Sequence, residues 1–330
     1  MDLRKIVGHQ TLMQIAASII IVDEEGKVLL CQRTDNGKWG YAGGSVEIDE
    51  KVEDCAKREL LEETGLIAEE IEFFMINSGP AIHYTYPNGD EVSNIEIVYI
   101  CKKYHGTIKP QEDEVSAIKF CAVEDIDMEM ISEPIRPVVA NYIKSVTGVE
   151  KKVVFLGSSV TYGSAAGGVS FADFISERNG WTMIKEAVSG TTLVDRDSES
   201  YISRLKKLDV SECDLFVCQL STNDATLQYP IEEIKEAILF IIDYAKKAWN
   251  CKIAFYTNPK YDSSEYEAMV SLIKEIASAE NIVLVNMWDD EALNQKIDEK
   301  RDYYMADAIH PTKAGYLEVI TPFVEKCKLL

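Results

Sequence analysis

The sequence is poor in the residues that build zinc sites and disulfide scaffolds. Its eight cysteines lie far apart without a C-x-x-C pair, and the 330 residues include only four histidines. Neither a zinc site nor a disulfide-stapled fold is predicted from these numbers. We expect reduced thiols and a cytoplasmic location.

Basic residues are scarce as well. Lys and Arg number 34 against 56 Asp and Glu, which gives a formal net charge of -22. A protein that binds a nucleic-acid backbone needs a basic surface. We therefore expect no nucleic-acid partner, although a single nucleotide bridged by a metal ion is compatible with this charge.

Long apolar runs are also missing, so no segment is expected to span a membrane. The run over residues 12–22 is interrupted by Gln14 and Ser18, and the acidic residues 23–25 follow where a signal peptide would need small residues. We interpret the run as a buried strand and predict no membrane partner.

With 46% hydrophobic and 27% charged residues, the composition is that of an ordinary globular protein. Its length favours two domains. We predict a boundary in the short segment Thr147–Glu150, with domains at residues 1–148 and 149–330. The oligomeric state is not indicated by any sequence feature.

The first half shows strand patterns, with a hairpin over residues 14–32, further strands at 71–76, 81–86, 95–102 and 117–122, and a helix at 137–146. The second half alternates strands and helices. Its strands are expected at 153–156, 215–220, 252–256 and 282–287, and its helices from about 170, at 231–249, at 264–280 and after Pro311. Nearly all-apolar strands separated by helices predict a parallel sheet covered on both faces.

An acidic helix is the most constrained element of the first half. Glu59, Glu62 and Glu63 have the spacing i, i+3, i+4, which places three carboxylates on one face of a helix. A hard divalent cation would balance their repulsion. Asp49 is the expected N-cap, and Gly65 is the expected stop.

This segment resembles the Nudix hydrolase signature, G-x5-E-x7-R-E-U-x-E-E-x-G-U with U aliphatic. Every specified position matches: Gly44, Glu50, Arg58, Glu59, Leu60, Glu62, Glu63, Gly65 and Leu66. The preceding residues 34–44 resemble the family's W-G-x-P-G-G approach, with Ala42 in place of Pro. The resemblance implies an α/β/α sandwich with a mixed sheet that hydrolyses the diphosphate linkage of a nucleoside diphosphate joined to a group X, using Mg2+ or Mn2+.

The resemblance also implies the roles of individual residues. Glu59, Glu62 and Glu63 would be metal ligands, with Glu62 also taking part in catalysis, while Arg58 and Glu50 would pair to brace the loop. Glu114, with Glu112 behind it, is the candidate for a further metal-site carboxylate, and a solvated acidic loop is an equally good interpretation.

Substrate contacts are less well defined. Pro80, His83, Tyr84 and Tyr86 fall where relatives place base- and ribose-contacting residues, and they point toward both ADP-ribose and dinucleoside polyphosphates. Ordinary strand packing also explains the tyrosines.

In the second half, a buried strand leads into Gly157-Ser158-Ser159, which puts a hydroxyl at the carboxyl end of a parallel sheet. Residues 151–330 contain one histidine, His310, in the motif Asp307-Ala-Ile-His310. A serine needs a base to become nucleophilic and a carboxylate to orient that base. Ser159, His310 and Asp307 supply these groups.

These residues resemble the blocks of the SGNH (GDSL-type) esterases, with Ser158 replacing the usual Asp. Two intermediate blocks occur in the expected order at 187–192 and 221–224, where Ser221 replaces the usual Gly. The resemblance implies a flavodoxin-like α/β/α sandwich with a parallel sheet and no cofactor. It also implies that the Gly190 amide and the Asn223 side chain help to bind the oxyanion.

We therefore predict a bifunctional hydrolase whose partners are small-molecule nucleotides and small acyl esters, such as acetyl esters. An O-acylated nucleoside diphosphate derivative would use both sites. One alternative is an active esterase whose first half only senses a nucleotide. Another is that the second half is a thioesterase, an acylase or a lysophospholipase.

Overall fold

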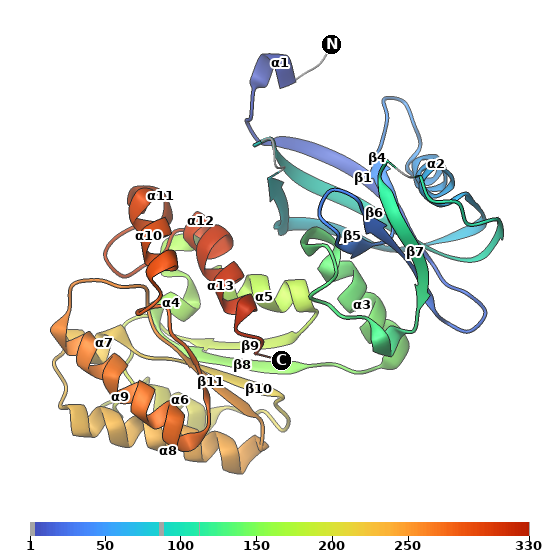
Figure 1. The fold of residues 1–330 in the computed structure, drawn as a ribbon. Coiled ribbons are helices and arrows are strands. Elements are labelled where there is room, and N and C mark those ends of the chain that lie inside the picture. The colour runs from blue at the N-terminus through green and yellow to red at the C-terminus, as the bar shows by residue number, and fades with distance from the viewer. Residues whose placement is uncertain (1–3, 86–88, 112, 330) are drawn as a thin grey trace. The chain divides into compact units, whose positions relative to one another are not determined.

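The computed structural model describes residues 4–85, 89–111 and 113–329. The chain divides into two compact units, Met1–Val149 with Arg178–Gly180 and Glu150–Glu177 with Trp181–Leu330. Figure 1 draws the first unit mainly in blue to green and the second mainly in yellow-green to red.

The first unit contains two sheets. A four-stranded sheet has the order β4 (Ala42–Ser45), β1 (Leu12–Ile21), β6 (Glu91–Gly106), β5 (Leu66–Thr85). Here β1 is parallel to β6, while the β1–β4 and β5–β6 pairs are antiparallel. The second sheet is antiparallel, with the order β3 (Trp39–Gly40), β2 (Val28–Arg33), β7 (Val115–Cys121). The predicted mixed-sheet architecture is confirmed.

The strand, turn and strand predicted over residues 14–32 are present, but the two strands do not pair along their length as a hairpin. Strands β1 and β2 lie in different sheets and are linked by a single bridge between Val22 and Val28. Both edges of β1 are already occupied by β4 and β6, so β2 pairs with β3 and β7 instead. The strand predicted at 71–76 and residues 81–85 of the strand predicted at 81–86 belong to one long irregular strand, β5, and residue 86 lies outside the described residues.

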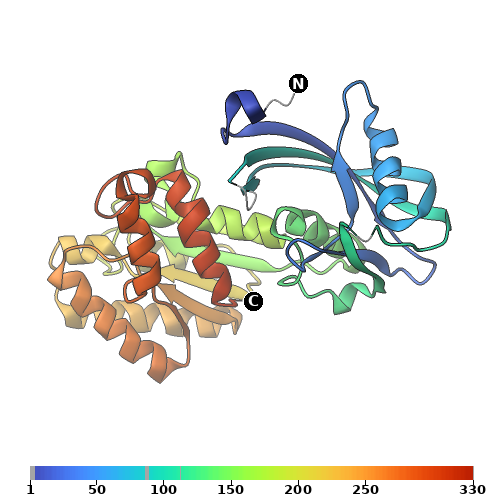
Figure 2. The same ribbon diagram turned by 45° about the horizontal axis from the view of Figure 1, so that its top comes forward.

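The helices of the first unit are α1 (Arg4–Val7), α2 (Val52–Thr64) and α3 (Arg136–Thr147), with short 3-10 turns at Val123–Asp125 and Glu133–Ile135. Helix α2 buries Ala56 and Leu60 in a core with Ala17 and Ile19 of β1. The other face of β1 carries Ile20 into a second core, to which α3 contributes Val138, Val139 and Tyr142. Figure 2 shows this unit from a second direction.

The ends of α2 differ in how well they were predicted. Gly65 ends the helix in the left-handed conformation, as expected. Asp49 is not the N-cap, because the residue before the helix is Lys51, and Asp49 itself has φ of 66° in the preceding turn.

The second unit has one parallel sheet with the order β12-β11-β10-β8-β9. Its strands are β8 (Lys152–Gly157), β9 (Thr182–Ala187), β10 (Leu215–Gln219), β11 (Lys252–Tyr256) and β12 (Val283–Val285). Because alternate side chains point to opposite faces, the central strands contribute to two separate cores, one on each face of the sheet. This is the predicted flavodoxin-like arrangement.

Helices cover both faces of this sheet (Figure 1). One core includes residues of α6 (Tyr201–Lys207), α7 (Thr222–Thr226), α8 (Ile231–Trp249) and α9 (Ser264–Glu280). The other includes residues of α4 (Ser159–Tyr162), α5 (Phe171–Asn179), α10 (Glu291–Glu299), α11 (Arg301–Tyr304) and α13 (Thr321–Lys326), and Ala314 of α12 (Lys313–Gly315) packs against it. Short turns complete the chain at Ser164–Ala166 (3-10) and Tyr316–Ile320 (π).

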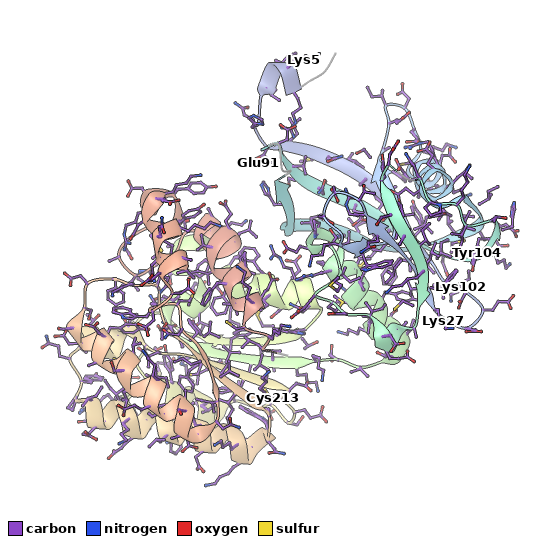
Figure 3. All side chains as sticks on the ribbon, in the orientation of Figure 1. Lys5, Lys27, Glu91, Lys102, Tyr104 and Cys213 are labelled. Atoms are coloured by element: carbon purple, nitrogen blue, oxygen red, sulfur yellow. The ribbon has the colours of Figure 1, made fainter. Side chains whose placement is uncertain are left out.

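None of the helices in the described part of the chain combines the length and apolar character that crossing a bilayer requires. The eight cysteines are free thiols. Cys213, labelled in Figure 3, precedes β10, and Cys251 precedes the neighbouring strand β11.

A stability prediction comes from Tyr266, which is fully buried on α9. Its hydroxyl donates to the Leu220 carbonyl (3.0 Å) and accepts from the Asn258 amide (2.9 Å). Tyr266→Phe leaves both backbone groups without this partner, so we expect the free energy of unfolding to fall by about 1–3 kcal/mol.

Chemical denaturation would measure this change. The matched control is Tyr303→Phe, because Tyr303 is 54% exposed and its hydroxyl donates to a surface glutamate. An equal loss in both variants would contradict the role of the buried hydroxyl.

Candidate functional site

In the second unit, three side chains form a continuous hydrogen-bonded chain. His310 Nε2 lies 2.8 Å from Ser159 Oγ, and His310 Nδ1 lies 2.8 Å from Asp307 Oδ2. The three residues predicted from the sequence are therefore brought together, with 151 positions separating Ser159 from His310. This geometry lets the imidazole accept the serine proton while the carboxylate orients the ring.

The loop before α12 holds the acid and the base in place. The backbone N–H groups of Ile309 and His310 both donate to Asp307 Oδ1 at 2.7 Å. Burial alone would raise the pKa of Asp307, but these donors and the imidazole outweigh burial and lower the pKa. The carboxylate therefore stays ionised and can stabilise an imidazolium.

Ser159 is the first residue of α4, directly beyond β8, and its position is fixed by Gln219 at the end of β10. Gln219 Oε1 accepts from the Ser158 amide (2.9 Å) and from Thr161 Oγ1 (2.9 Å). Ser158, which stands where the family has Asp, is fully buried in this network. A Cβ at Gly157 would lie 1.7 Å from Thr161 Oγ1, so only glycine permits this close turn.

The two intermediate blocks meet beside the serine's helix. Asn223 Nδ2 donates to the Thr191 carbonyl (2.8 Å), which uses one of its two N–H groups. The fully buried Asp224 accepts from the backbone amides of Leu193 (2.8 Å) and Val194 (3.0 Å). These bonds fasten the loop that carries Gly190 to the start of α7. Within the described ranges, the Gly190 amide donates no hydrogen bond to the protein.

Arg204 of α6 connects the same loop to the sheet. It is 5% exposed, and its guanidinium donates to the carbonyls of Gly157 (2.8 Å) and Glu186 (2.8 Å) and to Thr191 Oγ1 (3.0 Å). One buried cation thus joins the end of β8, the end of β9 and the loop after Gly190. Buried charge is stable only with such complete pairing.

In the first unit, Arg58 of α2 organises the acidic helix. It forms a two-pronged ion pair with Glu50 (2.8 and 3.0 Å) and also contacts Glu59 (2.7 Å) and Glu62 (3.1 Å). The guanidinium lowers the pKa of Glu50 to about 2. A Cβ at Gly44 would come within 2.4 Å of the Glu59 carboxyl, so any larger residue here would displace that carboxylate from its present position.

Glu63 is the most buried acidic side chain of α2, at 8% exposure. Burial, together with the charges of Glu59 and Glu114, raises the pKa of Glu63 to about 8. Burial, together with the charges of Glu62 and Glu114, also raises the pKa of Glu59, although Arg58 opposes this shift. Glu114 approaches because the Gln111 amide of its loop donates to the Glu63 carbonyl (3.2 Å).

These carboxylates have the oxygen chemistry that a hard divalent cation prefers. Glu63 is buried and forms no ion pair with the described residues, while the partly buried Glu59 shares Arg58 with Glu50 and Glu62. A cation would supply the missing positive charge. In the arrangement seen here, however, no three acidic, Cys or His side chains among the described residues converge as a ready metal cage. Arg58 engages both Glu59 and Glu62, and Glu62 is half-exposed.

A cavity of about 730 Å³ opens beside the acidic helix. Its lining includes Arg58, Glu59, Glu63 and Glu114 at one part, and polar residues from β1, β5 and β6 at another. Such a volume is in the range of small-molecule sites.

Comparison with protein families assigns both halves. Residues 12–142 match the NUDIX domain, and residues 155–317 match the GDSL-like Lipase/Acylhydrolase family.

The chain belongs to the Nudix family in its first half and to the GDSL acylhydrolase family in its second. It is therefore a hydrolase with two domains, as predicted from its signature motifs.

Relatives of the Nudix half include the NAD-capped RNA hydrolase NudC of Vibrio cholerae, 30% identical over 110 residues, which are 33% of this chain and 37% of NudC. Phosphatase NudJ of Escherichia coli K12 is 32% identical over 108 residues, covering 32% of this chain and 67% of NudJ. A crystal structure of a MutT NUDIX hydrolase from Burkholderia pseudomallei covers 39% of this chain and 96% of its own, at 23% identity and a TM-score of 0.33.

Several residues that shape the two sites belong to no pattern from which their role was predicted. In the GDSL half these are Arg204, Asp224 and Gln219, and in the Nudix half the buried Glu96. The candidate Glu112 lies outside the described residues, as do Tyr86 and the side chains of Pro80 and Tyr84. Asp224 could have been identified from its place in the motif S-T-N-D, whereas Arg204 belongs to no motif.

A prediction follows for Arg204 in the GDSL half. Arg204→Lys keeps the charge but cannot reach three acceptors at once, so the loop carrying Gly190 should shift. We expect kcat for a p-nitrophenyl acetate substrate to fall about 10- to 100-fold with little change in KM.

The control is Arg196→Lys, because Arg196 is an exposed residue paired with Glu233. Steady-state kinetics on both variants, with thermal unfolding to confirm folding, would test the idea. An unchanged kcat in folded Arg204→Lys would show that the loop does not depend on this guanidinium.

Proposed function

We propose that the GDSL half is a serine esterase and the Nudix half a metal-dependent hydrolase of nucleoside diphosphate derivatives. The observation that carries the esterase proposal is the unbroken hydrogen-bond chain Ser159–His310–Asp307. The Nudix proposal rests on the carboxylates of the buried Glu63 and the partly buried Glu59, which line the cavity.

In the esterase reaction, Ser159 Oγ attacks the ester carbonyl while its proton passes to His310 Nε2. The negative charge that develops on the carbonyl oxygen would be met by backbone amides of Ser159 and Gly190 and by the second N–H of Asn223. The imidazolium then gives its proton to the departing alcohol, leaving an acyl group on Ser159. Water, activated by His310, releases the acid and restores the serine.

The acyl group is proposed to be small, such as acetyl. The short segments that carry Gly190, Asn223 and His310 are held by hydrogen bonds that involve backbone groups. We therefore expect water-soluble acyl esters rather than lipids.

In the Nudix reaction, water would attack one phosphorus of a diphosphate linkage. A bound Mg2+ or Mn2+ would neutralise the phosphate charge and lower the pKa of the attacking water. Glu59, Glu63 and, once released from Arg58, Glu62 are the residues that would hold the metal, with Glu114 from the neighbouring loop. Arg58 and Glu50 brace the loop over residues 44–51 against α2.

The substrate is proposed to be ADP-ribose-like. Two relatives carry names of compatible chemistry, an NAD-capped RNA hydrolase and a phosphatase. The competing proposal is a nucleotide sensor, which the contact of Arg58 with both Glu59 and Glu62 favours. A sensor would bind ADP-ribose without turnover.

The esterase proposal predicts that Ser159→Ala lowers the hydrolysis rate of short p-nitrophenyl esters by at least about 10³-fold, because the attacking oxygen is removed. EDTA should leave the wild-type rate unchanged. Ser198→Ala, at an exposed position of the same half, serves as the control. Full activity of Ser159→Ala would rule out the proposed nucleophile.

The Nudix proposal predicts that EDTA abolishes hydrolysis of ADP-ribose and that Glu62→Gln lowers kcat by about 100-fold or more, since a metal-site carboxylate is lost. Asp54→Asn, an exposed change on the same helix, should have no effect. Product formation can be followed by chromatography. ADP-ribose binding with no turnover by the wild type would favour the sensor instead.

A further inference from the structure

The cavity of the Nudix half extends from the acidic helix onto one face of the four-stranded sheet. On this face, β1 presents Gln14, Ala16 and Ser18, and its parallel neighbour β6 presents Asn94 and Glu96. Farther along the same strands, the same face carries Ile20 and Val98 into the core under α3. The face therefore changes from apolar to polar where the cavity begins.

Glu96 is the central feature of this polar floor. It is 8% exposed, and it is held by three donors: Ser18 Oγ (2.7 Å), Tyr41 Oη (3.1 Å) and Asn77 Nδ2 (3.0 Å). No cation is among these hydrogen-bond partners. A buried carboxylate is costly, and ordinary packing would be served better by an apolar residue at this position.

The floor offers more unused acceptors than unused donors. Asn77 Nδ2 donates to both Glu96 and the Pro134 carbonyl (3.0 Å), so its two N–H groups are used. Asn94 Nδ2 donates to the Ile82 carbonyl (3.3 Å). In the part of the chain that the structure describes, the carbonyl oxygens of both amides accept no hydrogen bond from the protein.

A ligand that fits this floor must therefore bring hydrogen-bond donors. Among the described lining residues the only aromatic side chain is Tyr41, whose hydroxyl is committed to Glu96. A nucleobase site usually offers an aromatic face for stacking. A group that carries several hydroxyls, and needs no stacking partner, matches the floor better.

We propose that this polar floor binds the sugar part of the substrate and that Glu96 is a specificity-determining residue, accepting a hydrogen bond from a sugar hydroxyl. The inference rests on the proposed hydrolysis of a nucleoside diphosphate derivative, and it assigns the group X as a sugar. The diphosphate then lies toward Glu59 and Glu63, at the other part of the cavity.

The test compares two ligands that share the adenosine diphosphate part. ADP-ribose carries sugar hydroxyls beyond the diphosphate, and the methyl ester of ADP carries none. Calorimetry in the presence of Ca2+ gives Kd for each, while chromatography follows turnover in parallel with Mg2+. Glu96→Gln should weaken ADP-ribose binding at least about tenfold and leave the methyl ester unchanged.

Asn94→Ala is the second variant, because Asn94 stands outside the contacts that hold Glu96 and its loss leaves the buried carboxylate paired. It should show the same selective weakening. Glu72→Gln, at an exposed position of β5, is the control and should bind both ligands as the wild type does.

Equal effects on the two ligands, or no effect from either variant in folded protein, would overturn the assignment of the sugar. A wild type that binds both ligands but hydrolyses neither would contradict the proposed hydrolase function alone. The Kd comparison would still decide whether the polar floor recognises the sugar.

Discussion

A charged side chain that is buried away from water needs a hydrogen-bonding or ion-pair partner. This constraint determines how the site residues of each half are arranged. In the GDSL half, the buried guanidinium of Arg204 donates hydrogen bonds to backbone carbonyls at the ends of two strands. In the Nudix half, the Arg58 guanidinium forms ion pairs with Glu50, Glu59 and Glu62. Arg204 holds the loop that carries Gly190, and Arg58 holds carboxylates of helix α2, so each arginine positions groups that would meet a substrate.

The two halves differ in how complete their sites are. The triad is assembled, with its serine, histidine and aspartate already in hydrogen-bonding contact. In α2, by contrast, Glu59 and Glu62 are paired with Arg58, whereas Glu63 is buried. Burial is the main reason that the pKa of Glu63 is raised to about 8. An ester site needs only protein groups, whereas a diphosphate site brings large negative charge and depends on a cation to balance it.

The parts of the fold that sequence patterns predicted are those set by local rules. The alternation of apolar strands and amphipathic helices located α8, β11 and α9 at their observed bounds. The motif of Asp307 and His310 was legible because both residues lie within one turn of chain. Strand β9 was missed, since all six of its residues are only half-buried and show no apolar alternation.

What sequence patterns missed depends on contacts between distant segments. Arg204 and Asp224 bind backbone groups, which leave no mark on residue spacing. Glu96 looked like any surface acid until Ser18, Tyr41 and Asn77 were seen around it. The predicted pairing of β1 with β2 was wrong for a related reason. The turn residues 23–26 do not indicate which strands pair with β1 in the folded sheet.

The parallel pairing of β1 with β6 also bears on how the Nudix half folds. Leu12 pairs with Val92, 80 positions later, so the entropy of closing a long loop is lost before this contact is gained. High contact order of this kind slows folding. During synthesis, the edge of β1 that pairs with β6 therefore stays unpaired until β6 has left the ribosome. This edge includes the consecutive isoleucines at residues 19–21.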